Sequence, residues 1–216
     1  MSTDISADIT ALKDEFIQAG KTLYERGYAT GAAGNMSLLL PDGTVLATPT
    51  GSCLGTLERD RLSVLSHEGE LISGDKATKE VQFHLAIYHN NPEIKAIVHL
   101  HSCYCTAYSC LKDLDPKNAI KPFTPYVVMR MGEVPVIPYY KPGSPNLARD
   151  LAVVAPHHKA FLLANHGPIT GGKNITEAVN NAEELEATCK LYFVLGYDRE
   201  RIAYLNEAQI AELMPK

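Results

Sequence analysis

The chain contains 216 residues, 45% of them hydrophobic and 21% charged, a composition typical of a globular protein with one sizeable core. We therefore expect a single domain spanning residues 1–216. The formal net charge of −5 argues against nonspecific binding to nucleic acid or to an anionic membrane surface. No apolar run is long enough to span a bilayer, and residues 1–16 lack the basic-then-apolar order of a secretory signal.

Five cysteines are present, and no two of them form a C-x-x-C pair. An odd number without paired spacing argues against a disulfide framework and favours a reducing compartment. The sequence thus predicts a cytoplasmic protein whose partner is a small molecule, with no nucleic acid and no membrane.

The N-terminal part of the chain should begin with a helix over residues 6–27, because apolar side chains recur there every three or four positions. Short strands separated by turns should follow it over residues 35–40, 44–48, 62–66 and 70–73.

The rest of the chain alternates apolar runs with amphipathic stretches. Helices are expected over residues 78–90, 145–155 and 176–195. Strands are expected over residues 95–101, 127–131, 135–138 and 159–164, with another beginning at residue 169. Several connections are too short for helical crossovers, so the fold class is α/β with a mixed, largely antiparallel central sheet flanked by helices.

The sharpest local motif is His99-Leu100-His101 at the end of an apolar strand. Side chains two positions apart on a strand point the same way, so both imidazoles could reach one metal ion. The alternative is a pair of partly buried histidines satisfied by backbone hydrogen bonds. A third candidate ligand is His166, which follows an apolar run and precedes Gly167-Pro168 on a turn.

The remaining histidines are not grouped with these three. His157 and His158 lie at the start of a polar loop, and His67, His84 and His89 occupy helical or turn contexts without an evident partner. We interpret all five as structural or surface residues.

Glu80 lies at the start of the helix expected before His99. A carboxylate in the first helical turn is favoured by the helix dipole, and for an isolated glutamate that is the better explanation. If Glu80 instead faces a metal, it can serve as a ligand, as a general acid or base, or as each in turn.

Two short loops are candidates for binding an anion. Residues 31–37 (GAAGNMS) and 48–52 (TPTGS) are rich in glycine and in hydroxyl or amide side chains. Such loops can direct backbone N–H groups at a phosphate, although turn glycines alone would give the same pattern. Neither loop matches a nucleotide-binding motif.

Together these segments resemble the class II aldolase/adducin family, in the same order and spacing over nearly the whole chain. The matching segments are Gly34-Asn35-Met36-Ser37, Thr48-Pro49-Thr50-Gly51, Glu80 with His84-Leu85-Ala86-Ile87-Tyr88, His99-x-His101 and Asn165-His166-Gly167.

The resemblance implies a mixed-sheet α/β fold, a divalent metal that is usually zinc, and often a cyclic homotetramer. It implies that His99, His101 and His166 hold the metal and that Glu80 is the acid/base and a metal ligand when substrate is absent. It also implies a substrate-binding set that holds a phosphate: Gly34, Asn35, Thr50, Gly51, Thr78 and Lys79.

Three consecutive positions, Thr78, Lys79 and Glu80, distinguish branches of the family. Fuculose-phosphate aldolases usually carry two serines where this chain has Thr78-Lys79, so the extra cation suggests a more anionic substrate or a different phosphate clamp. Ribulose-phosphate epimerases typically carry aspartate where this chain has Glu80, which argues against that branch.

A narrower resemblance is to the 3-oxo-tetronate 4-phosphate decarboxylases. It rests on residues 74–76 (GDK), 124–130 (TPYVVMR) and 136–143 (VIPYYKPG), and it makes Tyr126 the presumed proton donor, entering from its own or a neighbouring subunit. The implied reaction is metal-dependent decarboxylation to dihydroxyacetone phosphate and CO2 through a metal-bound enediolate.

Two other functions fit parts of the same pattern. An aldolase or dehydratase acting on a related sugar phosphate would use the same enediolate, so the motifs alone separate these activities poorly. A non-enzymatic interaction domain of the adducin type is a third reading, but such domains usually lack the metal histidines, and this chain has all three.

Overall fold

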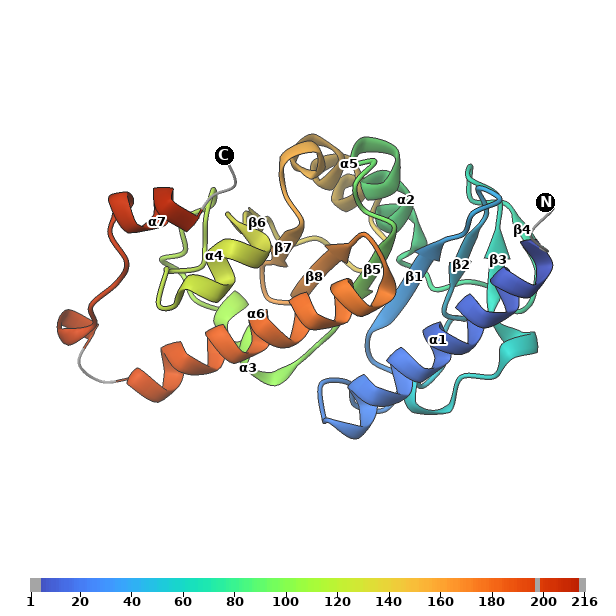
Figure 1. Ribbon diagram of the computed structural model, residues 1–216, viewed down its shortest axis with the longest axis horizontal. Helices are drawn as coiled ribbons and strands as arrows, with labels where there is room; N and C mark the ends of the chain where they lie inside the picture. The colour runs from blue at the N-terminus through green and yellow to red at the C-terminus, as the bar shows by residue number, and fades with distance from the viewer. Residues whose placement is uncertain (1–4, 197–198, 214–216) are drawn as a thin grey trace.

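The computed structural model describes residues 5–196 and 199–213, which form one mixed sheet with helices on both faces (Figure 1). The sheet has eight strands in the order β4-β3-β2-β1-β5-β8-β7-β6. Each neighbouring pair is antiparallel except β6 and β7, which are parallel. The expected fold class is therefore confirmed, while the extent of the domain, residues 1–216, stays a prediction.

The strands are short and mostly buried. Their bounds are β1 Asn35–Leu39, β2 Val45–Ala47, β3 Ser63–Leu65, β4 Leu71–Ser73, β5 Ala96–His99, β6 Val136–Ile137, β7 Ala160–Leu163 and β8 Gly167–Gly172.

Seven α-helices and four short 3-10 helices connect or cover these strands within the described ranges. The α-helices are α1 Ile5–Glu25, α2 Val81–Asn90, α3 Cys103–Ser109, α4 Pro125–Met131, α5 Pro145–Val154, α6 Ile175–Leu195 and α7 Glu207–Leu213. The 3-10 helices are Leu54–Thr56, Arg59–Arg61, Ala155–His157 and Arg199–Arg201.

Helices α1 and α6 cover one face of the sheet (Figure 1). Phe16 and Leu23 of α1 are fully buried there against Met36 and Leu46 of the sheet, and Ala178 of α6 joins the same cluster. Alternation along β1 directs Met36 and Leu38 to this face, so the intervening side chains point to the opposite one.

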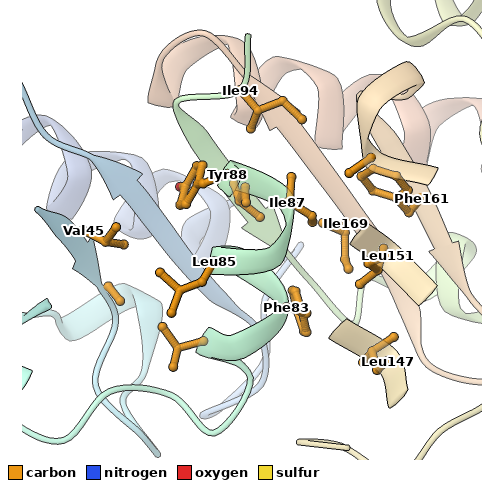
Figure 2. Close-up of a cluster of buried hydrophobic side chains, with 14 of the residues drawn as sticks. Val45, Phe83, Leu85, Ile87, Tyr88, Ile94, Leu147, Leu151, Phe161 and Ile169 are labelled. Carbon is orange, nitrogen blue, oxygen red and sulfur yellow. The ribbon is translucent and has the colours of Figure 1, made fainter. Parts of the chain in front are cut away.

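Helices α2 and α5 cover the opposite face. Figure 2 shows Phe83 and Ile87 of α2 lying between the sheet and α5, whose Leu147 and Leu151 complete the cluster. Asn35, Ser37 and His99 belong to the strand positions that face α2, and this side of the sheet carries the chemistry described below.

The prediction of a strand over residues 127–131 is wrong, because this segment is helix α4. Val127, Val128 and Met131 are buried in a third cluster with α3 and α6, a spacing that a helix satisfies and an alternating strand does not. Pro125 at the first helical turn also favours a helix start.

Two shifts in element bounds bear on the site. Helix α2 begins at Val81, so Glu80 lies just before it and not in its first turn. Strand β5 ends at His99, so His101 occupies the loop that follows. The sequence did not predict α3 or α7, whose seven residues each are too few to show a clear helical period.

All five cysteines are free thiols. None of the helices in the described part of the chain combines the length and apolarity needed to cross a membrane.

Candidate functional site

Strand β5 sets the position of the first histidine. His99 pairs with Asn35 on β1 and with Ile169 on β8, so it is held between two antiparallel neighbours in the middle of the sheet. Its side chain is fully buried, and the His99 and His101 rings lie with centroids 5.1 Å apart, which brings both onto the same side of the sheet as α2.

The third histidine is brought to the same place by the turn between β7 and β8. Asn165 has a left-handed backbone with φ 57°, and Gly167 has φ 152°. A Cβ on Gly167 would lie 2.3 Å from the Leu100 carbonyl oxygen, so only glycine permits this close approach of β8 to the end of β5. The turn thereby places His166 beside His99 and His101.

The three imidazoles form a compact group of nitrogen donors. Candidate ligand atoms of His99, His101 and His166 all lie within 4.8 Å of one another. The Nε2 atoms of His101 and His166 are 3.0 Å apart. A tetrahedral zinc ion bound at about 2.0–2.1 Å needs nitrogens roughly 3.3 Å apart, so the residues fit a three-histidine metal site.

The tautomer of His99 is fixed by the backbone. Its Nδ1–H donates to the Pro168 carbonyl oxygen at 2.9 Å, which leaves the Nε2 lone pair directed toward the other two histidines. Burial, with smaller contributions from His166 and His101, lowers the pKa of His99 well below its usual range. Burial also lowers the pKa of His166. Both rings are therefore held neutral, the form that binds metal.

Glu80 faces this group. Its Oε2 lies 3.4 Å from His99 Nε2, and its Oε1 lies 3.6 Å from His166 Nε2. Oε2 also accepts a hydrogen bond from Asn35 Nδ2 at 2.8 Å. The carboxylate makes no capping hydrogen bond to α2, so the helix-dipole explanation does not account for where it points.

Two polar atoms at the centre of the group lack partners. Glu80 Oε1 and His99 Nε2 are buried without a hydrogen bond among the residues that the structure describes. A buried polar atom without a partner is costly, and here both atoms belong to the group formed by Glu80 and the histidines. A cation bound between them would satisfy both atoms. A metal site therefore explains why they lack hydrogen-bond partners.

A pocket of about 280 Å³ opens beside Glu80 and His101. Its lining includes every residue that the sequence predicts to bind substrate: Gly34, Asn35, Thr50, Gly51, Thr78 and Lys79. Three segments supply them, and two of these, around Thr50 and Thr78, are joined by backbone hydrogen bonds. The Thr50 N–H donates to the Lys76 carbonyl oxygen at 2.9 Å, and the Thr78 N–H donates to the Thr48 carbonyl oxygen at 3.0 Å.

Gly34 links the pocket to the metal-binding strand. It has φ 83°, and a Cβ there would lie 2.9 Å from the His99 carbonyl oxygen. Glycine is therefore needed both for the backbone conformation and for the contact. Lys79 is the basic side chain in the described lining, and it can offset the charge of an anionic ligand.

Tyr126 is not brought to this pocket within one chain. It lies on α4, where the residue is 60% exposed, and it is absent from the described lining residues. The structure therefore groups the predicted metal and substrate residues but leaves the predicted proton donor on a separate surface.

The other histidines divide into two kinds. His89 Nε2 hydrogen-bonds the His67 carbonyl oxygen at 2.9 Å, and His158 Nδ1 bonds the Val154 carbonyl oxygen at 2.8 Å, as expected of structural residues. The expectation that His84 lacks a partner is wrong. It is fully buried and hydrogen-bonds both Ser37 and Asn35.

Glu186 is a second residue that the sequence reading missed. From α6 it accepts hydrogen bonds from Ser102 Oγ at 2.6 Å and from the Tyr104 and Cys105 backbone N–H groups at 2.8 Å each. It thereby secures the segment directly after His101. Its signal in the sequence is a glutamate on the apolar face of the helix, next to Leu185.

Known proteins resemble this chain over most of its length. A 3-oxo-tetronate 4-phosphate decarboxylase of Pectobacterium atrosepticum is 64% identical over 199 residues, covering 92% of this chain and 90% of the relative. An L-fuculose phosphate aldolase of Methanococcus maripaludis is 38% identical over 183 residues, covering 84% and 96%. The crystal structure of YgbL from Klebsiella pneumoniae superposes with a TM-score of 0.92 at 59% identity, covering 95% and 98%.

The family profile described as the class II aldolase and adducin N-terminal domain matches residues 14–193, which include all three histidines and Glu80. With the sheet order, the three-histidine group and the relatives in agreement, this chain belongs to the class II aldolase and adducin family.

Proposed function

We propose that this protein is a metal-dependent carboxy-lyase that converts 3-oxo-tetronate 4-phosphate to dihydroxyacetone phosphate and CO2. The observation that carries the proposal is the meeting of the three-histidine group and Glu80 with a pocket that contains Lys79. A relative 64% identical to this chain bears the name of this decarboxylase. We place the reaction in the cytoplasm.

The substrate has carboxylate at C1, hydroxyl at C2, ketone at C3 and phosphate at C4. It is a β-keto acid, so when the C1–C2 bond breaks and CO2 leaves, the electron pair is delocalised onto the C3 ketone oxygen as an enediolate. A proton added at C2 then gives dihydroxyacetone phosphate, and atoms and charge balance without any oxidant or reductant.

The family is divalent-metal dependent, and we propose zinc held by His99, His101 and His166, with Glu80 as a further ligand before substrate binds. When bound, the ion supplies Lewis-acid chemistry that favours negative charge on the enediolate oxygens. The hydrogen bond from His99 Nδ1 to Pro168 keeps the imidazole in the tautomer that offers Nε2.

Glu80 and Tyr126 are the residues that we propose to deliver the proton to C2. Glu80 lies against the histidine group and lines the pocket, so its carboxyl can deliver or relay a proton to C2. The phosphate is bound by Asn35, Thr50, Gly51 and Thr78. Gly34 allows the segment that carries Asn35 to approach the end of β5. Lys79 adds the positive charge that a substrate with both phosphate and carboxylate needs.

The decisive test is incubation of the metal-loaded protein with synthetic 3-oxo-tetronate 4-phosphate, with CO2 and dihydroxyacetone phosphate measured together. We expect the two products in equal amounts. The alternative is an aldolase on a related sugar phosphate, as the name of the Methanococcus maripaludis relative suggests. An aldehyde as the second product from a sugar phosphate, with no CO2 from the keto acid, would establish that alternative.

Removing any one of the three histidines should remove the metal. We expect His99→Ala, His101→Ala and His166→Ala each to lose most bound zinc and most turnover, because a site of three nitrogens becomes a site of two. Metal content after dialysis, measured by mass spectrometry, checks this. The control is His157→Ala, which changes an exposed histidine and should keep both the bound zinc and the turnover. Full metal and normal turnover in His99→Ala would contradict the ligand set.

Glu80→Gln should separate proton transfer from binding. The change keeps size and polarity but removes the titrating group, so we expect turnover to fall about 10²–10⁴-fold while KM changes little. The three histidines should still hold the metal, more weakly than in the unaltered protein because Glu80 is also a ligand before substrate binds. If Glu80 acted only through the helix dipole, the variant would lose about 0.3–1 kcal/mol of stability and turn over normally. Steady-state kinetics at matched metal loading distinguishes the two results.

Tyr126 leads us to propose a cyclic homotetramer in which this side chain enters a neighbouring subunit's site. Tyr126 and Met129 are 60% and 59% exposed on α4, which suits a surface covered by another copy. Tyr126→Phe and His166→Ala should each be nearly inactive alone, and co-expression should restore activity in mixed oligomers. Light scattering gives the assembly size, and a fully active monomer would refute the arrangement.

A further inference from the structure

A chain of buried hydrogen bonds runs from α2 through β1 to Glu80. Tyr88 Oη lies 2.7 Å from Ser37 Oγ, and Ser37 Oγ lies 2.8 Å from His84 Nδ1. His84 Nε2 lies 2.6 Å from Asn35 Oδ1, and Asn35 Nδ2 donates to Glu80 Oε2 at 2.8 Å. All five side chains are buried, and those of His84 and Ser37 are fully so.

The hydrogen-bond chain forms because the spacing of two residues on the helix matches the spacing of two residues on the strand. His84 and Tyr88 are four residues apart on α2, a rise of about 6 Å along a helix. Asn35 and Ser37 are two residues apart on β1, a distance of about 6.6–6.8 Å along a strand. The two pairs therefore face each other in register. In Figure 2, Tyr88 extends from the side of α2 that faces the strands, among apolar side chains.

Each hydrogen bond in the chain has only one possible direction when Glu80 is ionised. A carboxylate only accepts, so the Asn35 NH2 group must face Glu80 and its Oδ1 must face His84. His84 Nε2 must then carry the proton, and Nδ1 must accept from the Ser37 hydroxyl. Ser37 in turn accepts from Tyr88, the remaining donor.

The protonation of His84 and Tyr88 agrees with this direction. Burial, reinforced by His99 and opposed by Glu80, lowers the pKa of His84 to about 3, so the ring is neutral and carries one N–H. Burial raises the pKa of the Tyr88 hydroxyl, which therefore stays a donor. The groups facing His84 are Asn35 and Ser37 from β1, with Phe83 stacked at a centroid distance of 4.5 Å.

We propose that His84 is a positioning residue: as its Nε2–H tautomer it fixes the Asn35 amide with the NH2 group toward Glu80 and the pocket. This inference rests on the proposed function, because it assigns His84 a role at that site. Without the Nε2–H donor, the Asn35 amide can rotate and present its oxygen to the Glu80 carboxylate and to a bound phosphate. Both contacts then become repulsive.

Two substitutions at position 84 separate positioning from packing. In His84→Gln the amide nitrogen reaches toward the place of Nε2 and can still donate to Asn35. In His84→Asn the shorter side chain reaches only the place of Nδ1, so it can accept from Ser37 but cannot hold Asn35. Each variant leaves one buried partner unpaired, so we expect similar falls in melting temperature.

The kinetic expectation differs between the pair. At matched zinc content, His84→Gln should keep kcat/KM within a few-fold, whereas His84→Asn should lose about 10–100-fold, the usual cost of removing a residue that orients a ligand. If His84 serves packing alone, the two variants will lose activity equally or not at all. Equal activity in the two, or greater loss in His84→Gln, overturns the proposal.

A spectroscopic measurement tests the same point without turnover. In zinc-loaded protein with ¹⁵N-labelled histidine, the signals lost in His84→Gln identify His84, and we expect Nε2 protonated and Nδ1 unprotonated. A protonated Nδ1 would overturn the proposal whether or not the enzyme decarboxylates anything. Conversely, failure of the substrate assay with the expected tautomer present would reject the proposed function and leave the hydrogen-bond chain standing.

Discussion

The antiparallel pairing of β5 with β8 is the constraint on which the site depends. His99 lies opposite Ile169, and the Leu100 backbone N–H donates to the Pro168 carbonyl oxygen at 3.3 Å. Because this register is fixed by hydrogen bonds along the ladder, the turn before β8 must carry His166 to the end of β5. A slip of one residue would turn His99 to the other face of the sheet and disperse the three nitrogens.

Several polar side chains are buried together near that pairing, which is unusual in a core whose only role is stability. His84 on α2 and Glu80 just before it meet Asn35, Ser37 and His99 of the sheet, next to apolar side chains of the same helix. Most of their polar atoms are paired, which limits the cost of burying them. The two atoms left without partners, on Glu80 and His99, face the place where we infer a metal, so the residual cost coincides with the function.

The pocket residues also explain why one scaffold serves several reactions. Decarboxylation and aldol cleavage both place negative charge on the same two oxygens, and they differ in the group that leaves. The histidines and Glu80 suit either reaction. We propose that discrimination depends on side chains outside the histidine group, such as Lys79 in the pocket lining, and on Tyr126 from a neighbouring subunit.

The sequence by itself determined the fold class, the three metal-ligand candidates and the two loops over residues 31–37 and 48–52, because period-two and helical patterns, turn glycines and spaced histidines are local signals. The place of Thr78 and Lys79 beside those loops was implied only by the family resemblance. It misread residues 127–131, where β-branched side chains suggested a strand but contacts with α6 selected a helix. Only the tertiary structure decided that Glu80 faces the histidine group and that His84 hydrogen-bonds Asn35 of β1, which in turn bonds Glu80. Those contacts link residues 45 and 49 positions apart, a separation at which sequence periodicity carries no information.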